Sequence, residues 1–110
     1  MKIAVASSEN EVAGHFGYCE SFFIFRGEDG RITKQEELPN PGHRPGFLPK
    51  YLHDLGVNVI ISGGMGQNAI RLFEEQGIIV ITGVTGSPKE AAEKFLNESL
   101  PLTAEPCRKD

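Results

Sequence analysis

Two side chains that can bind metals lie close together in the stretch GHFGYC at residues 14–19. The imidazole of His15 and the thiol of Cys19 are borderline and soft ligands, which suit zinc, copper and iron–sulfur clusters. A second histidine, His43, follows in a stretch rich in proline and glycine, beside Arg44. His15, Cys19 and His43 are therefore candidate metal ligands, although a single histidine in a loop more often forms ordinary hydrogen bonds.

Two further sulfur atoms extend this candidate set. Met65 offers a thioether, and Cys107 offers a thiol near the C-terminus, where its presence could be incidental. Neither a C-x-x-C nor an H-x-x-x-H pair occurs in the chain. The spacing therefore does not predict a plain zinc site.

A glycine-rich turn, SGGMGQNA at residues 62–69, lies between an apolar run and an amphipathic helical pattern. The free N–H groups and the positive end of the dipole at a helix N-terminus suit an anion. Glycine allows the backbone to approach a ligand closely. Gly63, Gly64, Met65 and Gly66 are thus candidate binding residues. The alternative is a tight turn without a ligand, since the spacing matches neither the dinucleotide fingerprint nor the P-loop.

The residues needed for the common hydrolytic reactions are missing. A nuclease of the ribonuclease-H type holds metal ions with several converging carboxylates, but residues 2–7 include no Asp or Glu. No nucleophile elbow for Ser-His-Asp catalysis occurs. A thiol enzyme built on Cys19 and His15 would lack an orienting third group. The sequence therefore favours a binding protein over an enzyme.

The elements that must position these residues can be read from the hydrophobic pattern. Apolar runs predict strands at residues 3–6, 22–25, 57–61 and 78–81. The turn signal at 27–30 predicts a hairpin in which residues 31–38, whose alternation is weak, form a strand near the sheet edge. Amphipathic patterns predict helices that begin near Phe47, after Gly66 and at Pro88, where Ser87 and Glu90 form a capping box. The pattern predicts an α/β, ribonuclease-H-like three-layer fold with a mixed five-stranded sheet of order 3-2-1-4-5, in which only strand 2 is antiparallel.

This topology predicts where the candidate residues lie. Strands 1, 3, 4 and 5 end at the same edge of the sheet, and the loops 7–20, 39–46, 62–66 and 82–87 leave those ends. We call these four loops the rim. Ligands of open α/β sheets bind outside the carboxyl ends of the strands. We therefore expect the glycine turn, His15, Cys19 and His43 to face one rim.

Composition sets further limits on the class of protein. The length predicts one domain, residues 1–98, followed by a tail at 99–110. A net charge of -4 and a pI near 5.4 disfavour a nucleic-acid binder. The lack of an apolar run of about 18 residues predicts no membrane span. With no export signal and only two cysteines, we expect free thiols and a cytoplasmic protein, as a monomer or weak homodimer.

Three motifs together resemble one known family. They are AGHFG at 13–17, NPGH at 40–43 and ISGGMG at 61–66, the last followed by Gly77-Ile78. Over about residues 1–98 the chain resembles the dinitrogenase iron–molybdenum cofactor biosynthesis family. The resemblance implies a ribonuclease-H-like fold, no catalytic carboxylates and, for some members, binding of iron–sulfur or molybdenum–iron–sulfur clusters. It also implies that His15 is a cluster ligand, whereas Tyr18-Cys19 and Cys107 depart from the pattern.

These observations lead to three hypotheses. The first is a non-enzymatic carrier of an iron–sulfur or molybdenum–iron–sulfur cluster that works with cofactor-assembly proteins, with Arg44 and Lys50 attracting the anionic cluster and a mobile 39–46 loop admitting it. The second is a small anion- or metabolite-binding module in which residues 63–66 hold the anion. The third is a protein-interaction domain that presents the strand at 31–38 as a sheet edge.

Overall fold

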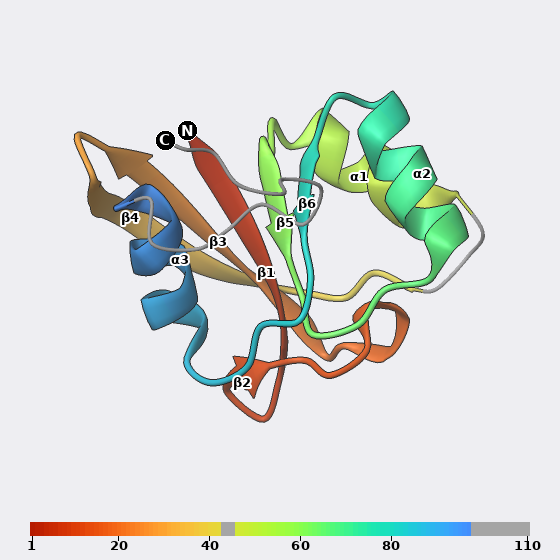
Figure 1. Cartoon of the computed structure of the whole chain (residues 1–110), viewed down its shortest axis with the longest axis horizontal. Coiled ribbons are helices and arrows are strands. Elements are labelled where there is room, and N and C mark those ends of the chain that lie inside the picture. The colour runs from red at the N-terminus through yellow and green to blue at the C-terminus, as the bar shows by residue number, and fades with distance from the viewer. Residues whose placement is uncertain (43–45, 98–110) are drawn as a thin grey trace.

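The computed structural model describes residues 1–42 and 46–97, which form a mixed α/β fold around one sheet (Figure 1). The strands are β1 (Lys2–Ser8), β2 (Glu11–Val12), β3 (Ser21–Glu28), β4 (Arg31–Pro39), β5 (Val59–Ile61) and β6 (Ile79–Ile81). The helices are α1 (Phe47–Asp54), α2 (Gln67–Glu75) and α3 (Pro88–Leu96), with a short 3-10 helix, η1 (Phe16–Tyr18). The predicted tail at 99–110 lies outside the described residues.

The sheet has the order β4-β3-β1-β5-β6, with β2 paired to β1 beside this path. β3 is antiparallel to both β1 and β4, whereas β5 is parallel to β1 and to β6. Among the five longer strands, this order and these directions coincide with those expected from the sequence. The two-residue strand β2 was not expected, because it is short and lies in a polar, glycine-containing segment.

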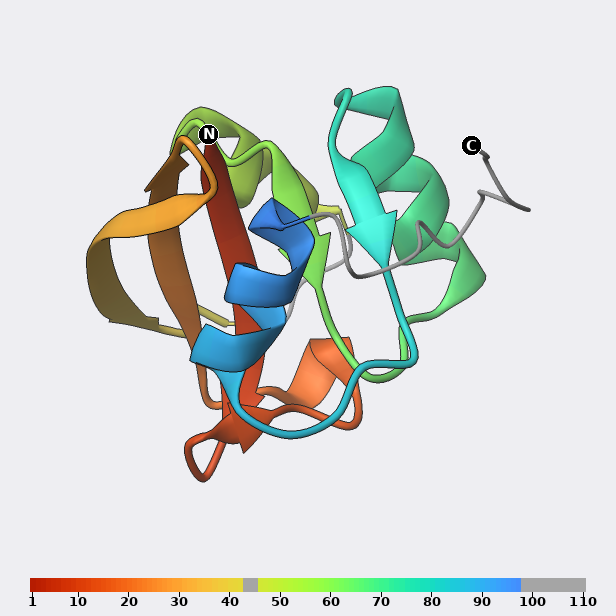
Figure 2. The same cartoon turned by 60° about the vertical axis from the view of Figure 1, so that its left-hand side comes forward.

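The helices cover the two faces of the sheet (Figures 1 and 2). On one face α1 and α2 pack against alternate strand residues, and this core contains Ala4, Ala6, Phe22, Ile24, Ile60, Val80, Leu48, Leu52 and Phe73. On the other face α3 packs against the remaining strand residues, and that core contains Ile3, Val5, Phe25, Val59, Ile61, Ile81, Ala91 and Ala92. The central strand β1 is thus buried on both sides, as its continuous apolar sequence predicts.

Local sequence signals explain several element boundaries. Asp29 and Gly30 both have positive φ in the turn between β3 and β4, which is the conformation that a two-residue hairpin turn requires. At the start of α3 the Ser87 hydroxyl accepts a hydrogen bond from the Glu90 amide at 3.2 Å, with Pro88 at the first helical position. The predicted hairpin and the predicted helix N-terminus are therefore confirmed.

The segment 7–20 was predicted as a long loop, and that prediction is wrong. β1 continues to Ser8, β2 pairs back onto it, and η1 follows. Main-chain hydrogen bonds explain the extra order, since the Ala13 amide donates to the Ala6 carbonyl at 2.7 Å and the Val12 amide donates to the Gly86 carbonyl at 2.8 Å. None of the helices within the described ranges is long and apolar enough to cross a membrane.

Candidate functional site

The rim is held together by main-chain hydrogen bonds between loops that are distant in the sequence. The Gly63 amide donates to the Ala13 carbonyl at 2.8 Å, and the Phe16 amide donates to the Gly64 carbonyl at 2.8 Å. These bonds join the loop that carries His15 to the glycine turn before α2. Figure 2 shows η1 beside the segment that leads from β5 to α2. The predicted proximity of the His15 loop and the glycine turn is therefore found.

The glycines of the turn make room for this loop. A β-carbon on Gly63 would lie 2.7 Å from the Ala13 carbonyl oxygen and 2.9 Å from the Gly14 Cα, and one on Gly64 would lie 3.0 Å from the Gly14 carbonyl oxygen. The Gly63 carbonyl also accepts a hydrogen bond from the Gly83 amide at 2.6 Å. Because the Gly63 N–H is already bonded to Ala13, it does not point at a ligand.

His15 lies on the surface of the rim. It precedes η1, and its side chain does not cap that helix. Its ring lies beside the ring of Tyr18, with centroids 4.9 Å apart and an interplanar angle of 42°. Phe16, between them, is buried against Phe22 and Phe73, with centroid distances of 5.8 and 5.3 Å. The loop is thus anchored by Phe16, while the imidazole faces outward.

Tyr18 is the residue of this site that sequence reasoning missed. From the sequence a tyrosine at this position is more often a packing residue, yet 76% of the surface of Tyr18 is exposed. An aromatic side chain at this exposure offers an apolar face with a polar tip beside the His15 imidazole. The sequence signal was the spacing of three between His15 and Tyr18, which places both residues on one side of a 3-10 turn.

The Cys19 thiol does not face outward from the rim, which corrects the expectation from the sequence. Only 4% of its surface is exposed, and it packs in the core on the α1 and α2 side of the sheet. The Asn40 side-chain amide donates to the Cys19 carbonyl at 2.9 Å and contacts Sγ at 3.6 Å. Burial raises the pKa of the Cys19 thiol to about 11. The thiol is therefore protonated at neutral pH, and only the thiolate is a good metal ligand.

The other candidate residues are two at the end of the glycine turn and two that the structure does not describe. Met65 packs, partly buried, against the core on the α1 and α2 side, and Gly66 is the N-cap of α2 without a side-chain capping bond. His43 and Cys107 lie outside the described residues. Within residues 1–42 and 46–97, no group of three or more His, Cys, Asp or Glu side chains could hold a metal ion.

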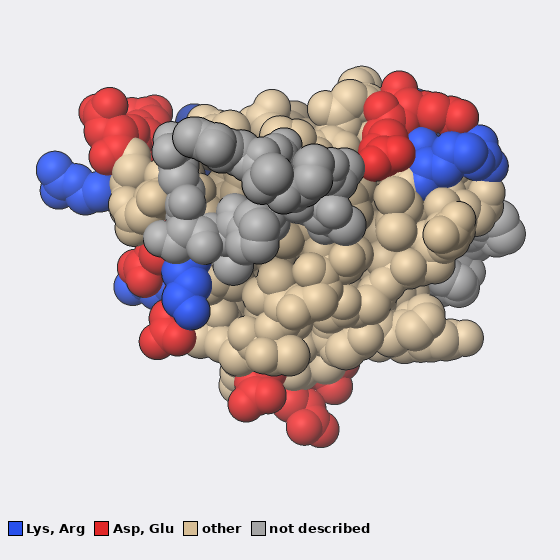
Figure 3. Space-filling model, in the orientation of Figure 1, with Lys and Arg blue, Asp and Glu red and all other residues tan. Residues whose placement is uncertain are grey.

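The part of the rim that the structure describes contains no Lys or Arg and does not favour an anion. Glu9 and Glu11 are exposed where β1 turns into β2, and residues 3–25 include no Lys or Arg. Figure 3 shows acidic side chains at the end of the molecule where β2 lies. A guest at this rim would thus depend on direct coordination by the His15 imidazole more than on attraction by positive charge.

Comparison with known proteins agrees with this architecture. A family model described as dinitrogenase iron-molybdenum cofactor matches residues 1–98. The chain belongs to the dinitrogenase iron-molybdenum cofactor family. An uncharacterized protein of Methanocaldococcus jannaschii, MJ0580, is 35% identical over 105 residues, which cover 91% of this chain and 89% of that protein. It is similar to this chain over nearly its whole length.

Solved structures share the fold of this family member. PH0822 has a TM-score of 0.84 at 28% identity, covering 94% of this chain and 97% of that chain. The apo form of the orange protein from Desulfovibrio gigas has a TM-score of 0.80 at 19% identity, covering 97% and 96% of the two chains. At that identity the second likeness shows the fold alone.

Proposed function

We propose that this chain binds and carries a preformed iron–sulfur or molybdenum–iron–sulfur cluster, with His15 as the protein ligand, and that it catalyses no reaction. Membership of a family described by the iron–molybdenum cofactor of dinitrogenase supports the nature of the cargo. The exposed His15 imidazole on a rim of fixed main-chain geometry is the observation that carries the proposal. In this reading the cluster is cargo and not a resident cofactor.

The number of ligands distinguishes cargo from a resident metal. A structural metal ion in a protein is usually held by four side chains, and a resident iron–sulfur cluster by several cysteine thiolates. Of the three predicted ligands, Cys19 is buried with a protonated thiol, and His43 is not among the described residues. One imidazole suits a cluster that already carries its own sulfide ligands and has to be released again.

Several expectations belong to the same proposal. We class the fold as ribonuclease-H-like because β3 is the antiparallel strand of the order β4-β3-β1-β5-β6. We place the protein in the cytoplasm, where cofactor-assembly proteins would deliver and accept the cluster. Tyr18, whose ring touches that of His15, would form an apolar wall beside the bound cluster.

An anion- or metabolite-binding module is the second candidate function. The uncapped N-terminus of α2 at Gly66, without an acidic residue in its first turn, is the observation that favours it. The Gly63 N–H counts against it, because this group already donates to the Ala13 carbonyl and is not available to an anion. We therefore rank cluster binding first.

The test is anaerobic reconstitution of the full chain with iron, sulfide and molybdate, followed by gel filtration. Visible absorbance and the iron and molybdenum content report on the bound cluster. His15→Ala is compared with His53→Ala, a matched control in which an exposed histidine on α1, beside Asp54, is removed. Thermal unfolding confirms that both variants are folded.

We expect wild type and His53→Ala to retain colour and metal, and His15→Ala to lose most of both. Equal metal content in wild type and His15→Ala, whether high or zero, would overturn the proposal. A thermal shift with phosphate or nucleotides that persists in His15→Ala would favour the anion-binding alternative.

A further inference from the structure

The outermost strand β4 presents an edge that is suited to a second strand. Met1 and Gly27 exchange main-chain hydrogen bonds at 3.2 and 2.8 Å. The main-chain groups of Gly27 are therefore directed at β1, and this direction alternates from one residue of an antiparallel strand to the next. The main-chain N–H and C=O groups of Phe22, Ile24 and Arg26 in β3 are thus directed at β4. The main-chain groups of their partners in β4, Leu38, Glu36 and Lys34, are therefore directed at β3. The main-chain N–H and C=O groups of Gln35 and Glu37 are directed away from β3, at the open edge of the sheet.

The side chains on this edge have a charge pattern that is complementary to itself. Lys34 and Glu36 lie opposite Arg26 and Ile24 and so project from the same face of the sheet, while Gln35 between them projects from the other. All three side chains are exposed. Among the described residues neither Lys34 nor Glu36 forms an ion pair within its own chain.

We propose that β4 pairs antiparallel with β4 of a second copy of this chain, with the two Gln35 residues opposite each other on a two-fold axis. In this register Lys34 of each copy lies opposite Glu36 of the other. The pairing forms two equivalent opposite-charge contacts, and it joins the two sheets into one. A two-fold interface of this kind uses the same surface on both copies.

Charge excludes the neighbouring registers. The two strands can form hydrogen bonds only where residues whose main-chain groups face the open edge lie opposite each other. One copy of β4 can therefore shift along the other only in steps of two residues. A shift in one direction places Lys34 opposite Lys34, and a shift in the other places Glu36 opposite Glu36. Like charges directly opposite are destabilising. The register centred on Gln35 is the one that pairs opposite charges on both sides of the axis.

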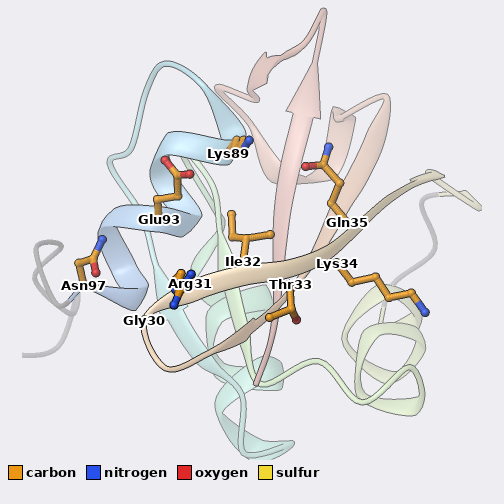
Figure 4. Close-up of a pocket in the computed structure, with 9 residues that line it drawn as sticks. All are labelled: Gly30, Arg31, Ile32, Thr33, Lys34, Gln35, Lys89, Glu93 and Asn97. Atoms are coloured by element: carbon orange, nitrogen blue, oxygen red, sulfur yellow. The ribbon is translucent and has the colours of Figure 1, made fainter.

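The face of β4 beside α3 leaves space for the second copy. A groove of about 640 Å³ separates β4 from α3. It is lined by Gly30 and the first five residues of β4, by Lys89 and Glu93 of α3, and by Asn97 at the C-terminal end of that helix. Figure 4 shows Ile32 and Gln35 projecting from β4 on the side of α3, whereas Lys34 projects away. Because Gln35 is exposed and lines this groove, α3 does not cover the position at which the two Gln35 residues would meet.

Two features limit the pairing to a closed dimer. The register between β3 and β4 shifts between Arg26 and Gly27, which leaves Thr33 as an extra residue at one end of the pairing segment. Pro39 at the other end has no N–H to donate. Since antiparallel pairing reverses the second copy, the two rims lie at opposite ends of the dimer, and His15 stays exposed in each.

Sedimentation velocity of the full chain, from about 10 μM to about 1 mM, tests this inference. The variants are Lys34→Glu, Glu36→Lys and the double exchange of both residues. Lys94→Glu, an exposed change on α3 outside the groove, is the control with the same change in net charge as Lys34→Glu. Gln35→Pro removes an outward N–H that β3 does not use.

We expect wild type, Lys94→Glu and the double exchange to dimerise in this range. Each single variant should dimerise at least about tenfold more weakly, because symmetry places like charges together twice. Gln35→Pro should be monomeric. A monomeric wild type at the highest concentration would overturn the inference, and so would a dimer whose strength is the same in all the variants.

Discussion

Gly63 and Ala13 lie so close together that a β-carbon on Gly63 would come within 2.7 Å of the Ala13 carbonyl oxygen. The atoms that would collide belong to backbone and cannot rotate away. The contact joins the turn before α2 to the loop that carries His15, and it explains why a residue without a side chain occupies position 63.

The first prediction concerns this contact. Gly63→Ala should lower the free energy of unfolding by about 1–3 kcal/mol, because it overpacks a fixed backbone contact. Gly14→Ala is the control, since a β-carbon at Gly14 would meet no atom within 4 Å, and its effect should stay within about 0.5 kcal/mol. Urea unfolding monitored by circular dichroism measures both. Equal stability of Gly63→Ala and wild type would contradict the geometry of the rim.

The second prediction concerns the ring pair of His15 and Tyr18. Tyr18→Ala should change the NMR chemical shift of the His15 ring proton at Cε1, because the neighbouring ring at 4.9 Å is lost. Tyr18→Phe keeps the ring and should leave this resonance close to its wild-type position. The same His15 resonance in wild type and Tyr18→Ala would show that the rings are not in contact in solution.

The third prediction concerns the buried thiol of Cys19. Its pKa rises to about 11 in the folded chain from a reference value of 9.0, so the folded state holds the proton more tightly than the unfolded state. The resulting stabilisation is complete below about pH 9 and is lost as pH rises to about 11, by at most about 1.4 kcal/mol per pH unit.

Measurement of unfolding free energy against pH for wild type and Cys19→Ala isolates this effect. The difference in unfolding free energy between the two proteins should be constant below pH 9 and should become smaller above it, because only wild type contains the Cys19 thiol. A difference that is independent of pH from 8 to 11 would mean that the Cys19 thiol is not buried.

The fourth prediction concerns the N-terminus of α3. Ser87→Ala removes the hydroxyl that accepts the Glu90 amide hydrogen bond, and it should cost about 1 kcal/mol of stability. Thr85→Ala, an exposed change in the same loop, should change stability by less than about 0.5 kcal/mol. The midpoint of guanidinium unfolding measures both. An effect of Ser87→Ala no larger than that of Thr85→Ala would exclude the cap as a source of stability.

Much of the architecture could be predicted because its signals are local. The buried strands are uninterrupted apolar runs, the turn at Asp29-Gly30 has the residues that a tight hairpin needs, and Ser87-Pro88 begins a helix. Short connections between these elements leave few ways to order the strands. The strand β2 has no such signal in its sequence. Its two residues are held by main-chain pairing with β1, which does not depend on the type of side chain.

The candidate site was harder to predict because it depends on the directions of side chains in an irregular segment. His15 and Cys19 are four residues apart and were expected to face the same rim. The 3-10 turn between them leads the chain back toward β3, so that the Cys19 thiol enters the core while the His15 ring stays outside. A segment without periodicity gives no sequence signal for this difference.

The bonds that fasten the His15 loop to the rest of the molecule run between backbone atoms, from Ala13 to Ala6 and Gly63, and from Phe16 to Gly64. Such a frame does not depend on which side chains stand at positions 15 and 18. Residues 15 and 18 could therefore be exchanged while the frame stays intact, and under the proposed function such an exchange would change the preferred cargo. Proteins with this fold and little shared sequence are free to have diverged at these two positions.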